Sequence, residues 1–176
     1  LAQKYQLKDT EVLAVVNAGQ VQNKLKQYDA AIIAFNRALG LARAIRMPSG
    51  ALYAYQGLGK TFNSLGKYLE SLEAYLQSLA LARNIVDRES EITALLGLGI
   101  NQRSLGRYEV ATGYFQEAQT LARTADQKKQ IQESIQELAQ TFEMAGDPSK
   151  ALAFYKEYHR LEKEIFNAES EKKSRD

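Results

Sequence analysis

The sequence predicts an all-α solenoid of stacked helical repeats, on three observations. A stretch running from Leu58-Gly59 to Tyr75 recurs every 40 residues, with glycines at 19, 59 and 99 and aromatic residues at 35, 75, 115 and 155. Apolar residues recur at helical spacing on both sides of each expected turn. Only two prolines occur in 176 residues, which favours helices joined by short turns. A fixed period of this length indicates stacked supersecondary units rather than one closed globule.

Composition excludes several classes of protein. The chain contains no cysteine, so it has neither a disulfide framework nor thiol chemistry, and we expect a cytoplasmic location. Its apolar runs are too short to span a bilayer, and no basic-then-apolar signal segment stands at the start. The net charge of +2 is nearly balanced and gives no general argument for nucleic acid or an anionic membrane.

The repeat divides the chain into four units with flanking pieces. Leu1-Ala2 is in register with Leu41-Ala42, which closes a repeat, so we expect the chain to be a fragment that begins inside an earlier helix. Asp9-Thr10 is then the expected N-cap of the next helix. The predicted segments are 1–8 (the end of that preceding helix), 9–46, 47–86, 87–126, 127–168 with a long capping helix, and 169–176, a polar tail or linker.

Small and large residues alternate where the two helices of each unit should cross. Gly19, Gly59, Gly99 and Ala139 share one position, and the aromatic series at 35, 75, 115 and 155 should fill the volume beside them. Gly66 is expected to end its helix in the left-handed conformation. On the first helix, helical spacing places Val12, Ala18 and Leu25 on the buried face.

These residues resemble the tetratricopeptide repeat. The pattern Leu-Gly, aromatic, Gly-x-Tyr, Ala and aromatic recurs in all four units, although Lys26 replaces the turn glycine in the first. The period exceeds the usual 34 residues of this repeat, which resembles the extended-repeat subset found in kinesin light chain-like proteins. The resemblance implies a right-handed superhelix with a concave groove lined by the first helix of each unit, and it implies no catalysis.

The last helix carries a second resemblance. Residues 155–172, beginning Tyr155-Lys156-Glu157-Tyr158-His159, are similar to the last repeat helix of bacterial signalling proteins, in which repeats precede a cyclase or histidine kinase domain. Its apolar stripe, which includes Leu161 and Ile165, runs past the repeat core. Two interpretations stay open. The helix is a cap that shields the last repeat, or it begins a coiled-coil linker through which the chain forms a homodimer.

Polar side chains of the first helices that point away from the partner helix are the predicted contact surface. The set is rich in amides, which can bond the backbone of an extended peptide, and includes basic residues that can pair with acidic groups. The predicted groove residues are Gln20, Asn23, Lys24, Gln56, Lys60, Asn63, Ser64, Asn101, Arg103, Gln136, Gln140 and Glu143.

Other kinds of site find little support. His159 is the single histidine and lacks the cysteines or paired carboxylates of a metal site. Gly57 and Gly59 lie inside a predicted helix, so they do not form a phosphate loop. Basic residues are dispersed rather than clustered beside stacking aromatics, which argues against nucleic acid. We predict no catalytic residue, cofactor, metal, nucleic acid or membrane partner.

Two functions therefore remain from the sequence. The first is a non-catalytic scaffold that binds a protein or peptide segment, with acidic character, in the concave groove. The second is a regulatory segment of a bacterial signalling enzyme whose output domain lies outside this chain.

Overall fold

The fold is a row of paired antiparallel helices. The computed structural model describes the backbone of residues 2–173 and the side chains of residues 7–167 and 170, so most of the expected tail at 169–176 lies outside the described side chains. Over this range every element is a helix: α1 (Ala2–Lys24), α2 (Tyr28–Ala44), α3 (Pro48–Ser64), α4 (Tyr68–Ile85), α5 (Arg88–Ser104), α6 (Tyr108–Thr124), α7 (Lys128–Met144) and α8 (Pro148–Lys173). We call α1, α3, α5 and α7 the first helices, and the others the second helices.

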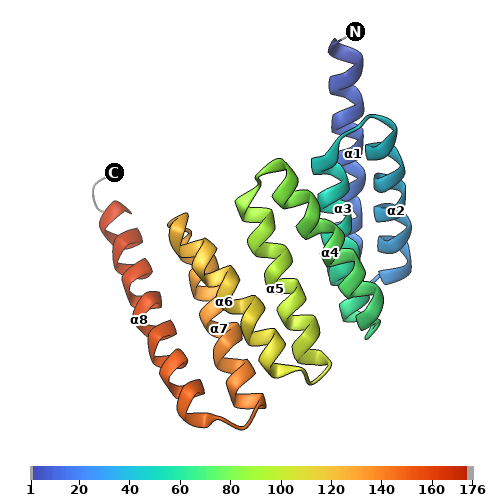
Figure 1. The fold of residues 1–176 in the computed structure, drawn as a ribbon. Coiled ribbons are helices and arrows are strands. Elements are labelled where there is room, and N and C mark those ends of the chain that lie inside the picture. Colours follow the sequence, from blue (N-terminus) through green and yellow to red (C-terminus); the bar gives the residue numbers. More distant parts are fainter. Residues whose placement is uncertain (1, 174–176) are drawn as a thin grey trace.

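The helices stack in chain order, and the predicted all-α solenoid is confirmed. Figure 1 shows the helix pairs following one another in a curved row, with the two ends of the chain at opposite ends of the row. Each helix contacts the one before and after it, and each first helix also contacts the next first helix. No described helix is long and apolar enough to cross a membrane.

The turns inside the units follow the predicted glycine chemistry. Gly66, Gly106 and Gly146 adopt positive φ angles of 71°, 73° and 80°. The amide of Gly66 donates to the carbonyl of Asn63 at 3.0 Å, which caps the end of α3. Lys26 takes the same left-handed conformation with φ of 60° and no glycine. Packing of the helices on either side therefore imposes this turn on a residue that does not favour it.

The boundaries between units also fall in turns, with one difference at the start. Arg46, Val86 and Asp126 adopt positive φ between successive units, close to the expected limits at 46, 86 and 126. By contrast, α1 continues through Asp9-Thr10 without a break, so residues 2–8 extend the first helix of the first unit. Figure 1 shows these turns of α1 projecting beyond the other helices. No described helix packs against residues 2–8. Because nothing there would offset the strain of a left-handed turn, α1 continues without a break.

Aromatic rings of the second helices lock the repeats together. The fully buried Phe35 ring lies between two glycines, and a Cβ atom on Gly19 or Gly57 would come within 2.7 or 2.3 Å of it. The ring of Tyr75 meets Gly59 and Gly97 in the same way, at 2.8 and 2.3 Å. Each ring thus contacts the first helix of its own unit and that of the next unit. The predicted alternation of small and large residues is confirmed in these units.

The buried face of α1 differs from the expectation. Val12, Val16 and Gly19 are buried as a continuous stripe, but Ala18 and Leu25 are exposed. The position of Ala18 corresponds, one period later, to Leu58, which is buried in a core cluster shared with residues of α1 and α2. No described helix lies on that side of α1, so the same helical position is exposed there.

Candidate functional site: the groove of the first helices

Two adjoining cavities form a groove along the first helices. The larger has a volume of about 510 Å³ and lies between α1, α3 and α5, while the smaller has a volume of about 300 Å³ and lies between α3, α5 and α7. They share Lys60, Ser64, Tyr75 and Thr93. We refer to the two cavities together as the groove.

The groove gathers seven of the predicted residues from α1 and α3. Six line the larger cavity (Gln20, Asn23, Lys24, Gln56, Lys60 and Ser64), and Asn63 lines the smaller. The other five predicted residues (Asn101, Arg103, Gln136, Gln140 and Glu143) line neither cavity. The groove therefore lies toward the N-terminal half of the array.

Some of the predicted amides form a hydrogen-bonded ladder between first helices. The side-chain amide of Asn23 donates to the Thr61 hydroxyl at 2.8 Å, and that of Asn63 donates to Oδ1 of Asn101 at 3.1 Å. Arg103 continues the series to the Thr141 hydroxyl at 3.4 Å. Each bond joins residues 38 apart, which is one repeat period less two residues. The ladder fixes neighbouring first helices relative to one another.

Asn101 and Arg103 use their polar groups for hydrogen bonds and ion pairs within the fold. Asn101 is fully buried and also donates to the carbonyl of Tyr68 at 3.0 Å. The Arg103 side chain, only 13% exposed, forms an ion pair with Glu137 at 2.6 Å and lies over the Phe115 ring. A glycine occupies the position of Glu137 in the two preceding units, as Gly57 and Gly97. The structure thus gives Asn101 and Arg103 packing roles instead of a free surface.

Toward the end of α7 the remaining predicted residues are separated from the cavities. Glu143 accepts a hydrogen bond from the Tyr155 hydroxyl at 2.8 Å, and this bond raises the pKa of that tyrosine. Gln136 is exposed and Gln140 half-buried. These three residues do not extend the groove.

The larger cavity is basic. Lys24, Lys26 and Lys60 line it, and no aspartate or glutamate does. In the smaller cavity Lys60 is joined by Glu133 of α7. Glu133 is exposed, and partial burial of its carboxyl raises the pKa, Glu137 adds to that rise, and Lys60 opposes it. An anionic ligand is therefore favoured at the α1–α3 end and disfavoured near α7.

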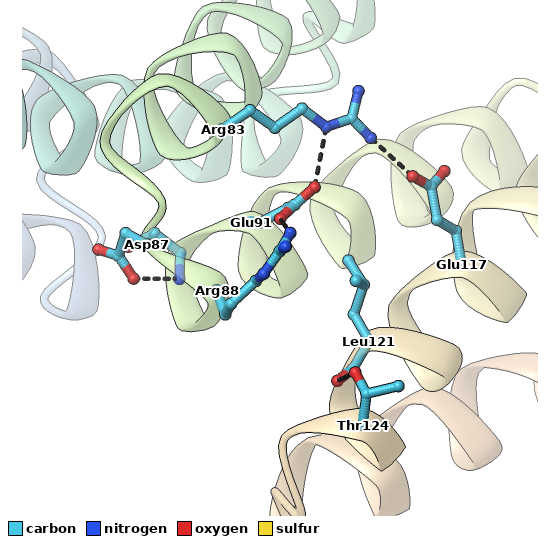
Figure 2. Close-up of polar contacts among 8 residues, drawn as sticks. Arg83, Asp87, Arg88, Glu91, Glu117, Leu121 and Thr124 are labelled. Carbon is cyan, nitrogen blue, oxygen red and sulfur yellow. Dashed lines mark hydrogen bonds and ion pairs between the residues drawn. The ribbon is translucent and has the colours of Figure 1, made fainter.

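An ion-pair network holds α5, which lines both cavities through Thr93. Figure 2 shows Glu91 between Arg83 and Arg88, at 2.8 and 2.7 Å, with Arg83 also reaching Glu117 at 2.6 Å. Asp87 caps the helix by accepting a hydrogen bond from the amide of Ser90 at 3.0 Å. Carboxylates near the start of a helix are favoured by its dipole. The network thereby fixes the start of α5 relative to α4 and α6.

Sequence reasoning missed several lining residues. Lys26 was assigned to a turn and Tyr75 to packing, yet both line the larger cavity, as does Thr93. Glu133, on the first turns of α7, was not singled out. The repeat offered one signal, because tyrosine at 75 replaces the phenylalanine of 35 and 115. A hydroxyl at a position where both adjacent units carry phenylalanine is compatible with a role beyond packing.

The fold and groove define a class of protein, the helical repeat solenoids. The tetratricopeptide repeat model matches residues 9–84 and 51–124. Because these matches cover more than half of the chain, the protein belongs to the tetratricopeptide repeat family. Repeats of this family are generally protein-interaction scaffolds and are typically non-catalytic. No curated protein sequence matches the chain.

Solved structures show the same fold. The tetratricopeptide repeat domain of Arabidopsis FLU is 26% identical, with a TM-score of 0.62 over 66% of this chain and 98% of that domain. BtubC from P. vanneervenii is 15% identical, with a TM-score of 0.78 over 90% of this chain and 65% of its own. Aspartyl phosphate phosphatase F from Bacillus subtilis is 13% identical, with a TM-score of 0.83 over 89% of this chain and 41% of its own. The last two likenesses concern the fold alone.

Proposed function

We propose that this chain is a non-catalytic scaffold that binds an extended, acidic segment of a protein partner in the groove of α1, α3 and α5. The observation that carries the proposal is the composition of the larger cavity, in which three lysines occur with the amides of Gln20, Asn23 and Gln56 and without a carboxylate. Asn23 and Gln56 already donate to Thr61 and to the Ser90 carbonyl, so Gln20 is the amide whose donors are uncommitted among the described residues. Amides can pair with the backbone of an extended peptide, and lysines can pair with its acidic side chains. Family membership supports a protein partner.

The proposal is tested by peptide selection followed by charge reversal. A phage-displayed library of random peptides is panned on the intact chain, and we expect enrichment of aspartate and glutamate. The peptide recovered most often is then labelled with fluorescein, and its binding is measured by fluorescence anisotropy. The double variant Lys24→Glu, Lys60→Glu should bind it at least about tenfold more weakly. The difference should shrink as salt is raised, since exposed charges are screened.

A matched control has the same net charge as the Lys24→Glu, Lys60→Glu double variant. Lys67→Glu combined with Lys129→Glu changes total charge equally, but neither residue lines the groove. Its affinity should stay near that of the unmodified chain. Equal losses in both double variants would show that total charge, rather than the groove, governs binding. A library without acidic enrichment would contradict the acidic character of the partner.

A second candidate rests on the length of α8. This helix has 26 residues, against 17 or 18 in the other second helices, and Phe166 on its extension is 68% exposed. A regulatory segment of a bacterial signalling enzyme would use such an extension to form a homodimer and transmit a signal. Light scattering tests this candidate. It requires a dimer that is lost when residues 161–176 are removed, and a monomeric intact chain contradicts it.

A further inference from the structure

Tyr75 differs by one hydroxyl group from Phe35 and Phe115, the equivalent residues of the two adjacent units, while the fourth unit carries a second tyrosine, Tyr155. Phe35, Tyr75 and Phe115 occupy the same position in successive units. Phe35 and Phe115 are fully buried, whereas Tyr75 is 8% exposed. The Cζ atom of Tyr75, which bears the hydroxyl, is among the atoms nearest to a Cβ built on Gly97 of α5, at 2.3 Å. The ring therefore reaches from α4 past α3 to α5, and the hydroxyl is the part that opens into the groove.

The Tyr75 hydroxyl has no hydrogen-bond partner among the described residues, although the side chain is more than nine-tenths buried. Burial raises the pKa of this phenol well above its ordinary value, so the group keeps its proton. The hydroxyl is not among the enclosed polar atoms that lack a partner, so it is open to the groove and accessible to a ligand. Phenylalanine in the neighbouring units shows that the fold itself does not need this hydroxyl.

Neighbouring polar groups at the junction of the two cavities are already occupied, with one exception. The Thr93 hydroxyl donates to the carbonyl of Glu89 and the Ser64 hydroxyl to that of Lys60, both at 3.0 Å. The Lys60 ammonium, by contrast, forms no ion pair with any described residue. Lys60 and Tyr75 line both cavities, so a cation without an ion pair and a hydroxyl donor without a partner face the same groove.

A carboxylate is the group that suits this pair of donors. Its two oxygens can accept from an ammonium and from a hydroxyl at once, and hydrogen bonds to an ionised acceptor are the stronger kind. The charges facing this point favour an anion on one side, where Lys24 and Lys26 line the larger cavity, and oppose it on the other, where Glu133 lies. The carboxylate should therefore enter from the α1 side.

We propose that Tyr75 and Lys60 form a subsite that recognises one aspartate or glutamate side chain of the bound peptide, with Tyr75 donating a hydrogen bond to the carboxylate. This inference rests on the proposed function, because it assumes that the groove holds a peptide. It assigns a specificity-determining role to a residue that the repeat pattern assigns to packing.

A double-mutant cycle tests the subsite. The probe is the fluorescein-labelled acidic peptide selected on the unmodified chain, together with versions in which each acidic residue is changed to its amide. Tyr75→Phe should bind the probe about tenfold more weakly, in keeping with the loss of a hydrogen bond to a charged group. One amide version should weaken binding to the unmodified chain similarly, and Tyr75→Phe should lose little further affinity for that version. Such coupling requires the hydroxyl and that carboxylate to interact.

Two controls keep the outcome clear. Tyr75→Phe reproduces a residue that the chain already carries at positions 35 and 115, so its melting temperature should not fall. Tyr108→Phe removes a hydroxyl that lies outside the groove and should leave affinity unchanged. If the unmodified chain selects no peptide, the proposed function fails. If it binds the probe and Tyr75→Phe binds equally well, or the effects of the two changes simply add, only the subsite is overturned.

Discussion

At the scale of single residues, contact between glycine and an aromatic ring sets how closely the helices approach. The rings of Phe35, Tyr75 and Phe115 leave no space for a Cβ atom on the glycines that face them. The fourth unit shows what happens otherwise, because Ala139 replaces the glycine and Tyr155 is only half-buried. Its hydroxyl instead bonds Glu143 near the surface. Thus, where alanine replaces glycine at position 139, the aromatic ring of Tyr155 lies outside the buried core.

Gly99→Ala should therefore lower stability, by about 1–3 kcal/mol, because overpacked cores force side chains and backbone to shift. The added Cβ would lie 2.4 Å from the fully buried Phe115 ring. Gly113→Ala is the matched control in the partner helix, where a Cβ would meet no atom within 4 Å. The control should gain up to about 1 kcal/mol from helix propensity. Urea unfolding measures both, and equal shifts would contradict the packing argument.

At the scale of elements, three ion pairs link the start of α5 to α4 and α6 through Arg83, Glu91 and their partners. Burial alone would raise the pKa of the Glu91 carboxyl, but hydrogen bonds and charge from Arg83 and Arg88 outweigh burial and lower the pKa below its ordinary value of 4.5. Glu91 is only 4% exposed. A buried carboxylate that lost one of its partners would carry an uncompensated charge.

The lowered pKa predicts how stability depends on pH. A group whose folded pKa is depressed contributes stability that is present above its unfolded pKa and is lost as pH falls through the folded value. The contribution of Glu91 should therefore be complete above pH 4.5 and decline below it. Glu91→Gln should be less stable near neutral pH, and it should lose less stability on acidification than the unmodified chain. Urea unfolding over a pH series measures this, and parallel curves would contradict it.

At the scale of the whole molecule, polar ladders run along both sets of helices. The first helices carry the amide ladder that begins at Asn23, and the second helices carry ion pairs between residues 34 apart. Arg83 pairs with Glu117 at 2.6 Å, and Arg123 pairs with Glu157 at 2.7 Å. Repeat arrays are stabilised mainly by such contacts between neighbouring units. The first pair of the ion series is absent, since Gln77 occupies the glutamate position 34 residues after Arg43, and both residues line one cavity.

Gln77→Glu should complete this ladder. The new carboxylate would stand opposite Arg43, whose guanidinium now donates to the Tyr55 hydroxyl at 2.9 Å. Both side chains are exposed, so the expected gain is only about 0.2–1 kcal/mol and should fall with added salt. Thermal unfolding at low salt measures the gain, and the double variant Arg43→Ala, Gln77→Glu should abolish it. A gain that persists without Arg43 would show that the ladder is not its source.

The sequence by itself determined the repeat, because helix formation and the pairing of adjacent helices depend on residues close together in the chain. Turn residues such as Gly66 and the spacing of glycine and aromatic positions carry that information locally. The free surface depends instead on how neighbouring units are offset, which brings together residues about one period apart. Only the tertiary structure therefore decided that Asn101 and Arg103 are used internally, that Lys60 stays free, and that the Tyr75 hydroxyl reaches the groove.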